Sequence, residues 1–330
     1  MTLPINTNEH RLDNDSGQSV CVSVHLWSHS VLVIALFFLA FTSALAQPAD
    51  LVRIVRLKLS AGDLASGDAA AEDYKKKNGV DAVYLDAIGW LARGAEMLKK
   101  LDMAAGYVAE IRREIHEEKS ELLSPLGAAI EVESKIRFAR EGRGSALRFL
   151  EDELTRAKDT ALRARISKNS NQMSLEGRPA MELGVSDGIG PKPPGLAELK
   201  GKPVLLFFWA HWCGDCKAQA APLNLVFQKY RSRGLMLIAP TRFYGTGAEN
   251  KPAAPAEEKA HMEKVLAEFY QGLEGISVPI DTDTMVRYGV SATPTFVLVD
   301  RKGIVRLYAP TRLSEAELCR RIEAVLTEAP

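Results

Sequence analysis

Two cysteines separated by two residues are the part of this sequence best suited to chemistry. Cys213 and Cys216 lie in the segment 212–216 (WCGDC), which follows the continuous apolar run 203–209. Such a run predicts a strand covered on both faces, and the residues after Cys213 predict a helix. Unpaired N–H groups and the positive end of the helix dipole would stabilise a thiolate on Cys213. A thiolate is the nucleophile of disulfide exchange.

The spacing of the two cysteines also suggests a division of roles. Cys216 lies one helical turn after Cys213, so its thiol can attack a mixed disulfide on Cys213 and release the reduced substrate. Zinc sites use the same spacing, but tetrahedral zinc needs two more ligands. The remaining cysteines, Cys21 and Cys319, are isolated. We therefore expect a redox dithiol, with Cys213 attacking and Cys216 resolving, and with no metal or cofactor.

Two segments carry a resemblance to a known family. Residues 201–217 (GKPVLLFFWAHWCGDCK) resemble the thioredoxin superfamily, above all its extracytoplasmic TlpA/ResA-like disulfide reductases, which are also grouped as redoxins. Residues 289–295 (GVSATPT) resemble the segment in which that family places a cis-proline facing the dithiol, with Pro294 at the matching position and Thr293 before it. The resemblance covers roughly residues 175–326. It implies that backbone beside Pro294 pairs with the substrate chain, and Trp212 is expected to shield the dithiol and to form part of the substrate surface.

Four positions near the dithiol depart from the family pattern. Phe207 stands where thioredoxin has a buried carboxylate, and Gln219 where these reductases often have a glutamate. Pro222 follows the second cysteine by six residues, whereas the family proline usually follows by five. Asp215 should oppose a neighbouring negative charge and so raise the pKa of Cys213. A raised pKa predicts a potential that favours reduction of substrates.

Other residues near the motif receive simpler interpretations. We expect His211 to be a partly exposed loop histidine and Cys319 to be a buried structural cysteine. Residues 247–259 read as a solvated polar insertion that leads into a helix.

Strands and helices alternate in the second half of the chain. Strands are expected over 203–209, 235–240, 295–299 and 304–308, and helices over 216–233 and 256–270, with a last helix capped by Ser314. The fold class is therefore α/β, a thioredoxin-like α/β sandwich preceded by an all-α, repeat-like helical domain.

The first half of the chain reads as helix after helix. Apolar residues recur at helical spacing from residue 50 to about residue 170, with breaks near 78–79, 101–102 and 142–144. Residues 90–111 resemble one tetratricopeptide-type hairpin, in which Ala92 and Ala104 would allow close helix packing and Leu91 would lie in the core. A plain helical domain fits the pattern equally well.

The N-terminus carries an export signal. Residues 31–41 are an unbroken apolar run, and Ala44 and Ala46 give the small-x-small pattern before a signal-peptidase cut. We assign residues 1–46 to a signal peptide or N-terminal membrane anchor, 47–172 to the helical, tetratricopeptide-like domain and 173–330 to the thioredoxin-like domain. This places the protein outside the cytoplasm, in the periplasm or cell envelope.

These observations predict a thiol-disulfide oxidoreductase of the cell envelope. Its partners would be a disulfide-bearing protein, a thiol electron donor such as a membrane reductant, and a protein bound by the helical domain. The alternative is a helical-repeat interaction protein whose thioredoxin-like domain is a scaffold. A thiol peroxidase fits less well, because Trp212 and Asp215 flank the thiols where that class needs a nearby Thr and Arg. The formal net charge of +0 argues against nucleic-acid partners.

Overall fold

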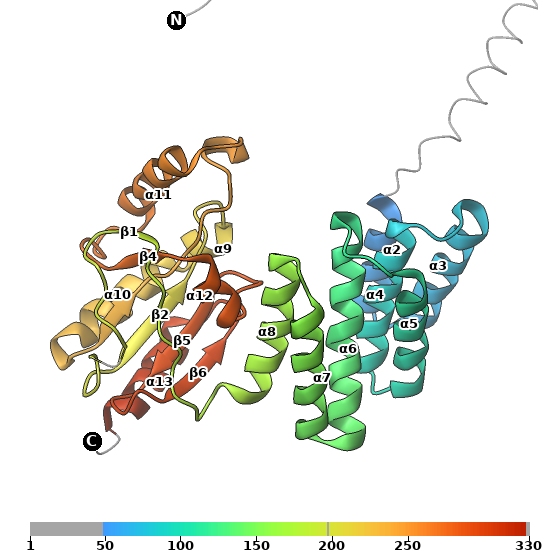
Figure 1. The fold of residues 1–330 in the computed structure, drawn as a ribbon, viewed down its shortest axis with the longest axis horizontal. Helices are drawn as coiled ribbons and strands as arrows, with labels where there is room; N and C mark the ends of the chain where they lie inside the picture. The colour runs from blue at the N-terminus through green and yellow to red at the C-terminus, as the bar shows by residue number, and fades with distance from the viewer. Residues whose placement is uncertain (1–48, 197, 328–330) are drawn as a thin grey trace, which may run out of the picture. The chain divides into compact units, whose positions relative to one another are not determined.

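Consecutive helices occupy the first part of the computed structural model, which describes residues 49–196 and 198–327 (Figure 1). They are α2 (Ala49–Ser60), α3 (Leu64–Asn78), α4 (Ala82–Met97), α5 (Leu101–Glu114), the 3₁₀ turn η1 (Ser120–Leu122), α6 (Leu123–Glu141), α7 (Arg143–Arg156) and α8 (Thr160–Ser174). Aspartates begin three of them: the carboxylates of Asp63, Asp81 and Asp159 accept hydrogen bonds from backbone N–H groups in the first turns of α3, α4 and α8. The expected succession of helices is confirmed.

The helices pack around two cores. One core gathers side chains of α2 to α6 around Tyr84, Leu91 and Ile111, all fully buried. The other lies between α6, α7 and α8 around Ile130 and Leu150. Within residues 90–111, Leu91, Ala92 and Ala104 are buried as expected where α4 and α5 pack together. Whether this hairpin is one of a series of repeats stays a prediction.

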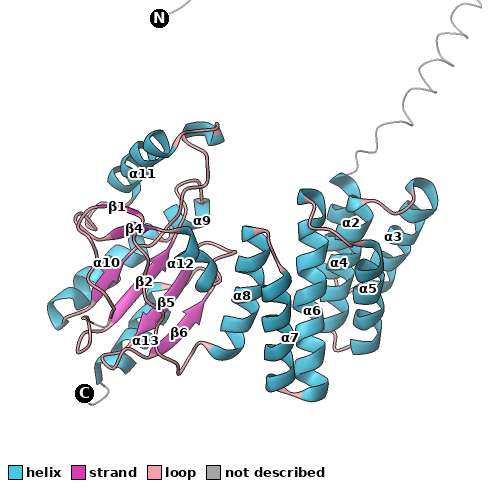
Figure 2. Cartoon of the chain, viewed as in Figure 1, coloured by secondary structure: helices cyan, strands magenta, loops and turns pink. Residues whose placement is uncertain are grey.

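The second part of the chain is a sheet with helices on both faces (Figure 2). Its elements are β1 (Asp187–Ile189), β2 (Val204–Phe208), α9 (Gly214–Ala218), α10 (Ala220–Tyr230), η2 (Arg231–Arg233), β3 (Met236–Ile238), η3 (Ala248–Asn250), α11 (Pro255–Phe269), β4 (Val278–Ile280), α12 (Thr282–Arg287), β5 (Thr295–Val299), β6 (Val305–Ala309) and α13 (Glu315–Thr327). The strand order is β3-β2-β5-β6, with β2 parallel to β3 and the other pairs antiparallel. A separate antiparallel pair joins β1 to β4.

Strand β2 separates two layers of core because alternate side chains point to opposite faces. Leu205 and Phe207 join a core built with α10 and α13. Leu206 and Phe208 join the core on the other face, which includes Tyr288. The expected α/β sandwich is confirmed, and β2 carries the dithiol segment at its carboxyl end.

Three short elements, and a break in one helix, were not predicted from the sequence. The sequence indicated neither the β1–β4 pair nor α12. The helix expected over 216–233 is divided into α9, α10 and η2, with Gln219 between the first two. Pro222 lies in the first turn of α10, where a backbone N–H has no intrahelical partner to lose. The proline therefore fits a helix that restarts after Gln219.

Residues 49 to 330 form one compact unit. The helical part meets the sheet part through α8, which packs against α12 and β6. The leader expected over residues 1–46 lies outside the described residues. Among the described helices, none has the length and apolar content needed to cross a bilayer.

Candidate functional site

Cys213 caps the helix that begins after β2. The backbone N–H of Cys216 donates to Cys213 Sγ at 3.1 Å, and the Cys213 thiol donates to the carbonyl oxygen of Thr293 at 3.4 Å. Cys213 is 5% exposed and Cys216 is fully buried, and both are free thiols. The thiol nearer the surface is therefore the one that the sequence assigns as the attacking group.

The pKa values of the two thiols are shifted in opposite directions. The pKa of Cys213 is lowered from 9.0 to about 6, chiefly by hydrogen bonding from the Cys216 side chain, and further by the Thr293 side chain and the Cys216 backbone. The Thr293 carbonyl accepts a hydrogen bond only from the protonated thiol, so this contact opposes ionisation. The pKa of Cys216 is raised, first by its interaction with Cys213 and then by burial. At neutral pH the pair holds one thiolate, on Cys213.

The pKa of Cys213 corrects one prediction from the sequence. Asp215 does act to raise it, but its effect is smaller than those of the hydrogen bonds to Cys213, and the pKa is lowered overall. Asp215 is 66% exposed along its side chain and lies 3.5 Å from the guanidinium of Arg312. Solvent and this cation screen its charge.

The proline segment lies against the attacking thiol. The peptide bond between Thr293 and Pro294 is cis. Thr293 presents its carbonyl to Cys213, and the hydroxyl of Thr295 donates to the carbonyl of Ala292 at 2.8 Å. The structure thus brings the two cysteines together with Thr293, which lies 80 residues after Cys213 in the sequence.

Trp212 lies at the surface beside the dithiol. It is 47% exposed, and the edge of its ring meets Tyr244 with 5.4 Å between ring centroids. Trp212, Cys213, Tyr244 and residues 290–293 line one groove with a volume of about 590 Å³. The expected place of Trp212, beside the dithiol on an accessible surface, agrees with this arrangement.

His211 is not the partly exposed loop residue that we expected. It is fully buried, and its Nδ1 lies 3.7 Å from Oε1 of Glu258, which is also fully buried. Burial lowers the pKa of His211, and the neighbouring carboxylate opposes this effect. The Glu258 carboxylate accepts hydrogen bonds from the backbone N–H groups of Tyr244 and Gly245. The sequence missed this role of Glu258, because the segment 247–259 reads as a solvated insertion.

The place of the absent buried carboxylate is filled by aromatic rings. Phe207 packs against Phe296 and Tyr270, with centroid distances of 5.2 and 6.0 Å. The Tyr270 hydroxyl is buried with no hydrogen-bond partner among the described residues. Its pKa is raised, first by burial and then by the negative charge of the two cysteines. No carboxylate occupies the position of Phe207 to take the second proton.

Gln219 joins the dithiol helices to the segment just before α13. Its side-chain amide donates to the carbonyl of Leu313 at 2.9 Å, and its carbonyl oxygen accepts from the Leu313 N–H at 3.1 Å. It is 1% exposed. An amide satisfies both backbone groups, whereas an ionised carboxylate satisfies only the N–H. This is a structural reason for glutamine at the departure from the family pattern.

Cys319 on α13 is only partly buried, which corrects the expected full burial. It packs beside the core of α10 and α13, and Lys229 Nζ lies 3.9 Å from its Sγ. It lies outside the groove that contains Cys213. In the part of the chain that the structure describes, no three His, Cys, Asp or Glu side chains gather as metal ligands would.

Comparison with known proteins agrees with this geometry. Residues 195–326 match the family model of a thioredoxin-like domain. The thiol-disulfide oxidoreductase ResA of Geobacillus thermodenitrificans is 25% identical over 134 residues, which are 39% of this chain and 67% of that protein. ResA of Bacillus cereus is 29% identical over 129 residues, which are 39% of this chain and 66% of that protein.

A solved structure also aligns with this part of the chain. It is that of a candidate thiol:disulfide interchange protein DsbE from Chlorobium tepidum, with 26% identity, a TM-score of 0.37, and coverage of 46% of this chain and 97% of that one.

The chain therefore contains a thioredoxin-like domain. That domain is homologous to the ResA thiol-disulfide oxidoreductases, which supports an oxidoreductase that exchanges disulfides. The ResA match spans about two thirds of that relative's length, and the family-model match begins at residue 195, after helices α2 to α8.

Proposed function

We propose that this protein is an extracytoplasmic thiol-disulfide oxidoreductase in which Cys213 is the nucleophile and Cys216 the resolving thiol. The observation that carries the proposal is that Cys213 is the N-cap residue of α9. Its Sγ accepts a hydrogen bond from the backbone N–H of Cys216 at 3.1 Å, and its pKa is lowered to about 6 while that of Cys216 is raised. One thiol is thus ready to attack at neutral pH, and the other keeps its proton until the mixed disulfide has formed.

The reaction balances with the dithiol as the reductant. The Cys213 thiolate attacks one sulfur of the substrate disulfide, that bond breaks, and the other substrate sulfur leaves as a thiolate that takes up a proton. Cys216 then loses its proton and attacks Sγ of Cys213, which releases the second substrate thiol. The enzyme is left with a Cys213–Cys216 disulfide, and an external thiol donor must supply two electrons to reduce it again.

We expect the dithiol to reduce substrate disulfides rather than to form them. A thiolate pKa of about 6 lies nearer to that of thioredoxin, about 7, than to that of the strong oxidant DsbA, about 3.5. We expect the reduction potential of the dithiol to lie nearer to that of thioredoxin, about −270 mV, than to that of DsbA, about −120 mV. Equilibration with glutathione buffers measures it, and a value close to that of DsbA contradicts the assignment.

The proposal also covers location and domain roles. The apolar run 31–41 and the Ala44-x-Ala46 site support export to the periplasm or envelope. We assign residues 173–330 to the catalytic domain and 47–172 to a helical domain that binds or orients a partner. Cell fractionation with alkaline phosphatase fused after residue 46 tests the export signal, because that enzyme is active only outside the cytoplasm.

Three variants, one of them a control, test the activity. With dithiothreitol as the electron donor, Cys213→Ser should lose catalysed reduction of insulin disulfides, whereas Cys319→Ser, which lies outside the groove, should keep it. Cys216→Ala should accumulate mixed disulfides on Cys213 that can be identified by mass spectrometry. Equal rates for wild type and Cys213→Ser would refute the nucleophile and favour the alternative of a scaffold attached to a helical interaction domain.

A further inference from the structure

The groove over Cys213 is lined from both halves of the chain. Besides Cys213, Trp212 and Tyr244, its lining includes Ala161, Ala164 and Arg165 of helix α8. These residues lie outside the segment that matches the thioredoxin-like family model. Whatever occupies the groove above the reactive sulfur therefore meets α8 as well as the thioredoxin-like domain.

Helix α8 is held close to the proline segment. A Cβ built on Gly289 would lie 2.3 Å from the backbone nitrogen of Lys168 and 2.5 Å from its Cα, so the two backbones are in direct contact. The Asn171 side chain donates to the carbonyl of Arg287 at 2.9 Å. The contact at Gly289 lies four residues before Thr293, which bonds the Cys213 thiol. This packing fixes the position of α8 beside the groove.

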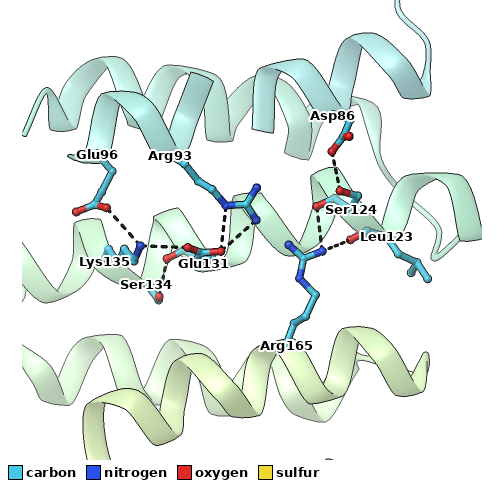
Figure 3. Close-up of polar contacts among 9 residues, drawn as sticks. All are labelled: Asp86, Arg93, Glu96, Leu123, Ser124, Glu131, Ser134, Lys135 and Arg165. Carbon is cyan, nitrogen blue, oxygen red and sulfur yellow. Dashed lines mark hydrogen bonds and ion pairs between the residues drawn. The ribbon is translucent and has the colours of Figure 1, made fainter. Parts of the chain in front are cut away.

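The guanidinium of Arg165 is fixed from the side of the helical domain (Figure 3). Its Nη1 donates to the carbonyl oxygens of Leu123 and Ser124, both at 3.2 Å. The Ser124 hydroxyl in turn donates to Asp86 at 2.6 Å. A Cβ on Gly127 would lie 2.5 Å from the Arg165 guanidinium, so the arginine crosses α6 at a position without a side chain. Arg165, whose side chain contributes to the groove lining, is thereby held against α6 through Nη1.

The charges that line the groove sum to a positive field. Arg165 and Arg242 line it, and among the described residues neither makes an ion pair with a carboxylate. Arg242 lies over the ring of Tyr244, 4.8 Å from its centroid. Burial lowers the pKa of Arg165, and so does the neighbouring cation Arg93, whereas the carboxylates of Glu131 and Asp86 oppose this effect. The acid of the groove, Asp215, is paired with Arg312 outside it.

Building on the proposed function, we propose that α8 forms part of the substrate-binding groove, where Arg165 and Arg242 select an acidic peptide segment beside the substrate disulfide. The apolar surfaces of Trp212, Ala161 and Ala164 contact the chain, and the two guanidinium groups bind its carboxylates. Opposite charge across an interface gives specificity and faster encounter more than it gives raw affinity. The preference should therefore be seen in the rate of reaction and should weaken with salt.

The experiment uses the reduced full chain and three peptides that each contain one intramolecular disulfide. Beside the cysteines the peptides carry glutamates, serines or lysines. Single-turnover reduction is followed by rapid acid quench and mass spectrometry. For the wild type we expect the acidic peptide to react about tenfold faster than the basic one at low ionic strength, and the ratio to fall towards one at about 1 M salt.

Charge-removing variants locate the effect. Arg165→Gln and Arg242→Gln should each reduce the acidic-to-basic ratio by about threefold, the effect expected of one partly exposed ion pair. Arg165→Lys should restore part of it. Arg143→Gln and Arg231→Gln remove the same charge at exposed sites outside the groove and should keep the ratio. Circular dichroism checks the fold of each variant, and the salt series needs no variant at all.

The outcomes separate this inference from the proposed function. If the wild type reduces all three peptides at equal rates, and Cys213→Ser reduces none, the charge selection is wrong and the oxidoreductase stands. If the acidic preference persists in both the Arg165→Gln and the Arg242→Gln variants, the assignment to these residues is wrong. If Cys213→Ser reduces the peptides as fast as the wild type, the proposed function itself fails.

Discussion

The ionisation of Cys213 gives the sharpest test of the site. The pKa of Cys213 is lowered from 9.0 to about 6, and the Cys216 side chain is the largest cause. At pH 7 the thiol would be about 90% ionised, against about 1% at the ordinary pKa, which is an increase in thiolate of about 90-fold. A less basic thiolate is also a weaker nucleophile. With a Brønsted coefficient of about 0.45, lowering the pKa by about 3 reduces the intrinsic rate about 20-fold.

The gain in thiolate fraction and the loss of intrinsic nucleophilicity largely offset each other at pH 7, so a rate at that pH alone is a weak test. The dependence of the rate on pH is a stronger one. Near pH 7 the net gain over an ordinary cysteine is only about four- to fivefold. The rate of alkylation of the reduced protein by iodoacetamide, read on the Cys213 peptide by mass spectrometry between pH 4 and 9, should instead rise with a midpoint near 6. Cys319 in the same samples lies outside the groove and serves as an internal reference for the alkylation reaction. A midpoint near 9 for Cys213 would refute the assignment.

Removal of the hydrogen-bond donor supplies the matched perturbation. A hydrogen bond to a charged group contributes about 1.5–3 kcal/mol, which corresponds to about 1–2 pKa units. Cys216→Ala should therefore move the Cys213 midpoint up by that amount, whereas Cys216→Ser keeps a hydroxyl donor and should move it less. Equal midpoints in the wild type and the alanine variant would show that the thiol of Cys216 does not stabilise the Cys213 thiolate.

Three further predictions follow from the same contacts. Between pH 6 and 9 the folded reduced protein has released the Cys213 proton while the unfolded chain retains it, so stability to urea should rise with pH across this window and should not do so in Cys213→Ala. Gln219→Glu removes the donor to the Leu313 carbonyl and should lower the free energy of unfolding by about 1–3 kcal/mol at pH 8, with a smaller loss at pH 5, where a protonated carboxyl can donate; equal stability at both pH values would contradict this. Gly289→Ala should lower the melting temperature more than Gly303→Ala does, since both positions have positive φ but only a Cβ at the first would meet neighbouring backbone. Equal melting temperatures would show that α8 can move away without loss of stability.

The strands that were predicted from the sequence are those with continuous apolar runs. The run 203–209 contains β2, and the limits expected for β5 match the structure. The pair β1–β4 has no such signal, because β1 contains Gly188 and β4 contains Pro279, residues that are rare inside strands. The break at Gln219 was hidden because the apolar spacing continues through it. There the side chain bonds to a segment 94 residues away, which no local pattern reveals.

The dithiol could be predicted because its chemistry depends on short spacing, whereas its surroundings could not. Cys213 and Cys216 act within one turn of helix, and Pro294 belongs to a recognisable segment. The burial of His211 depends instead on the neighbouring Glu258 carboxylate, and a glutamate is expected at the surface from the sequence alone. The carboxylate is buried because two backbone N–H groups satisfy it, and this requires the chain to turn at residues 244–245.

The proline segment joins the two halves of the molecule at the level of single atoms. At one end Gly289 touches the backbone of Lys168 on α8, and four residues later Thr293 bonds the Cys213 thiol. Arg165, on the same helix, is anchored to carbonyls of α6. A partner that moves α8 would therefore change both the lining of the groove and the hydrogen bond that favours the protonated thiol. Because one short segment makes both contacts, the proposed contribution of α8 to substrate choice and the environment of the Cys213 thiol are linked through the same backbone.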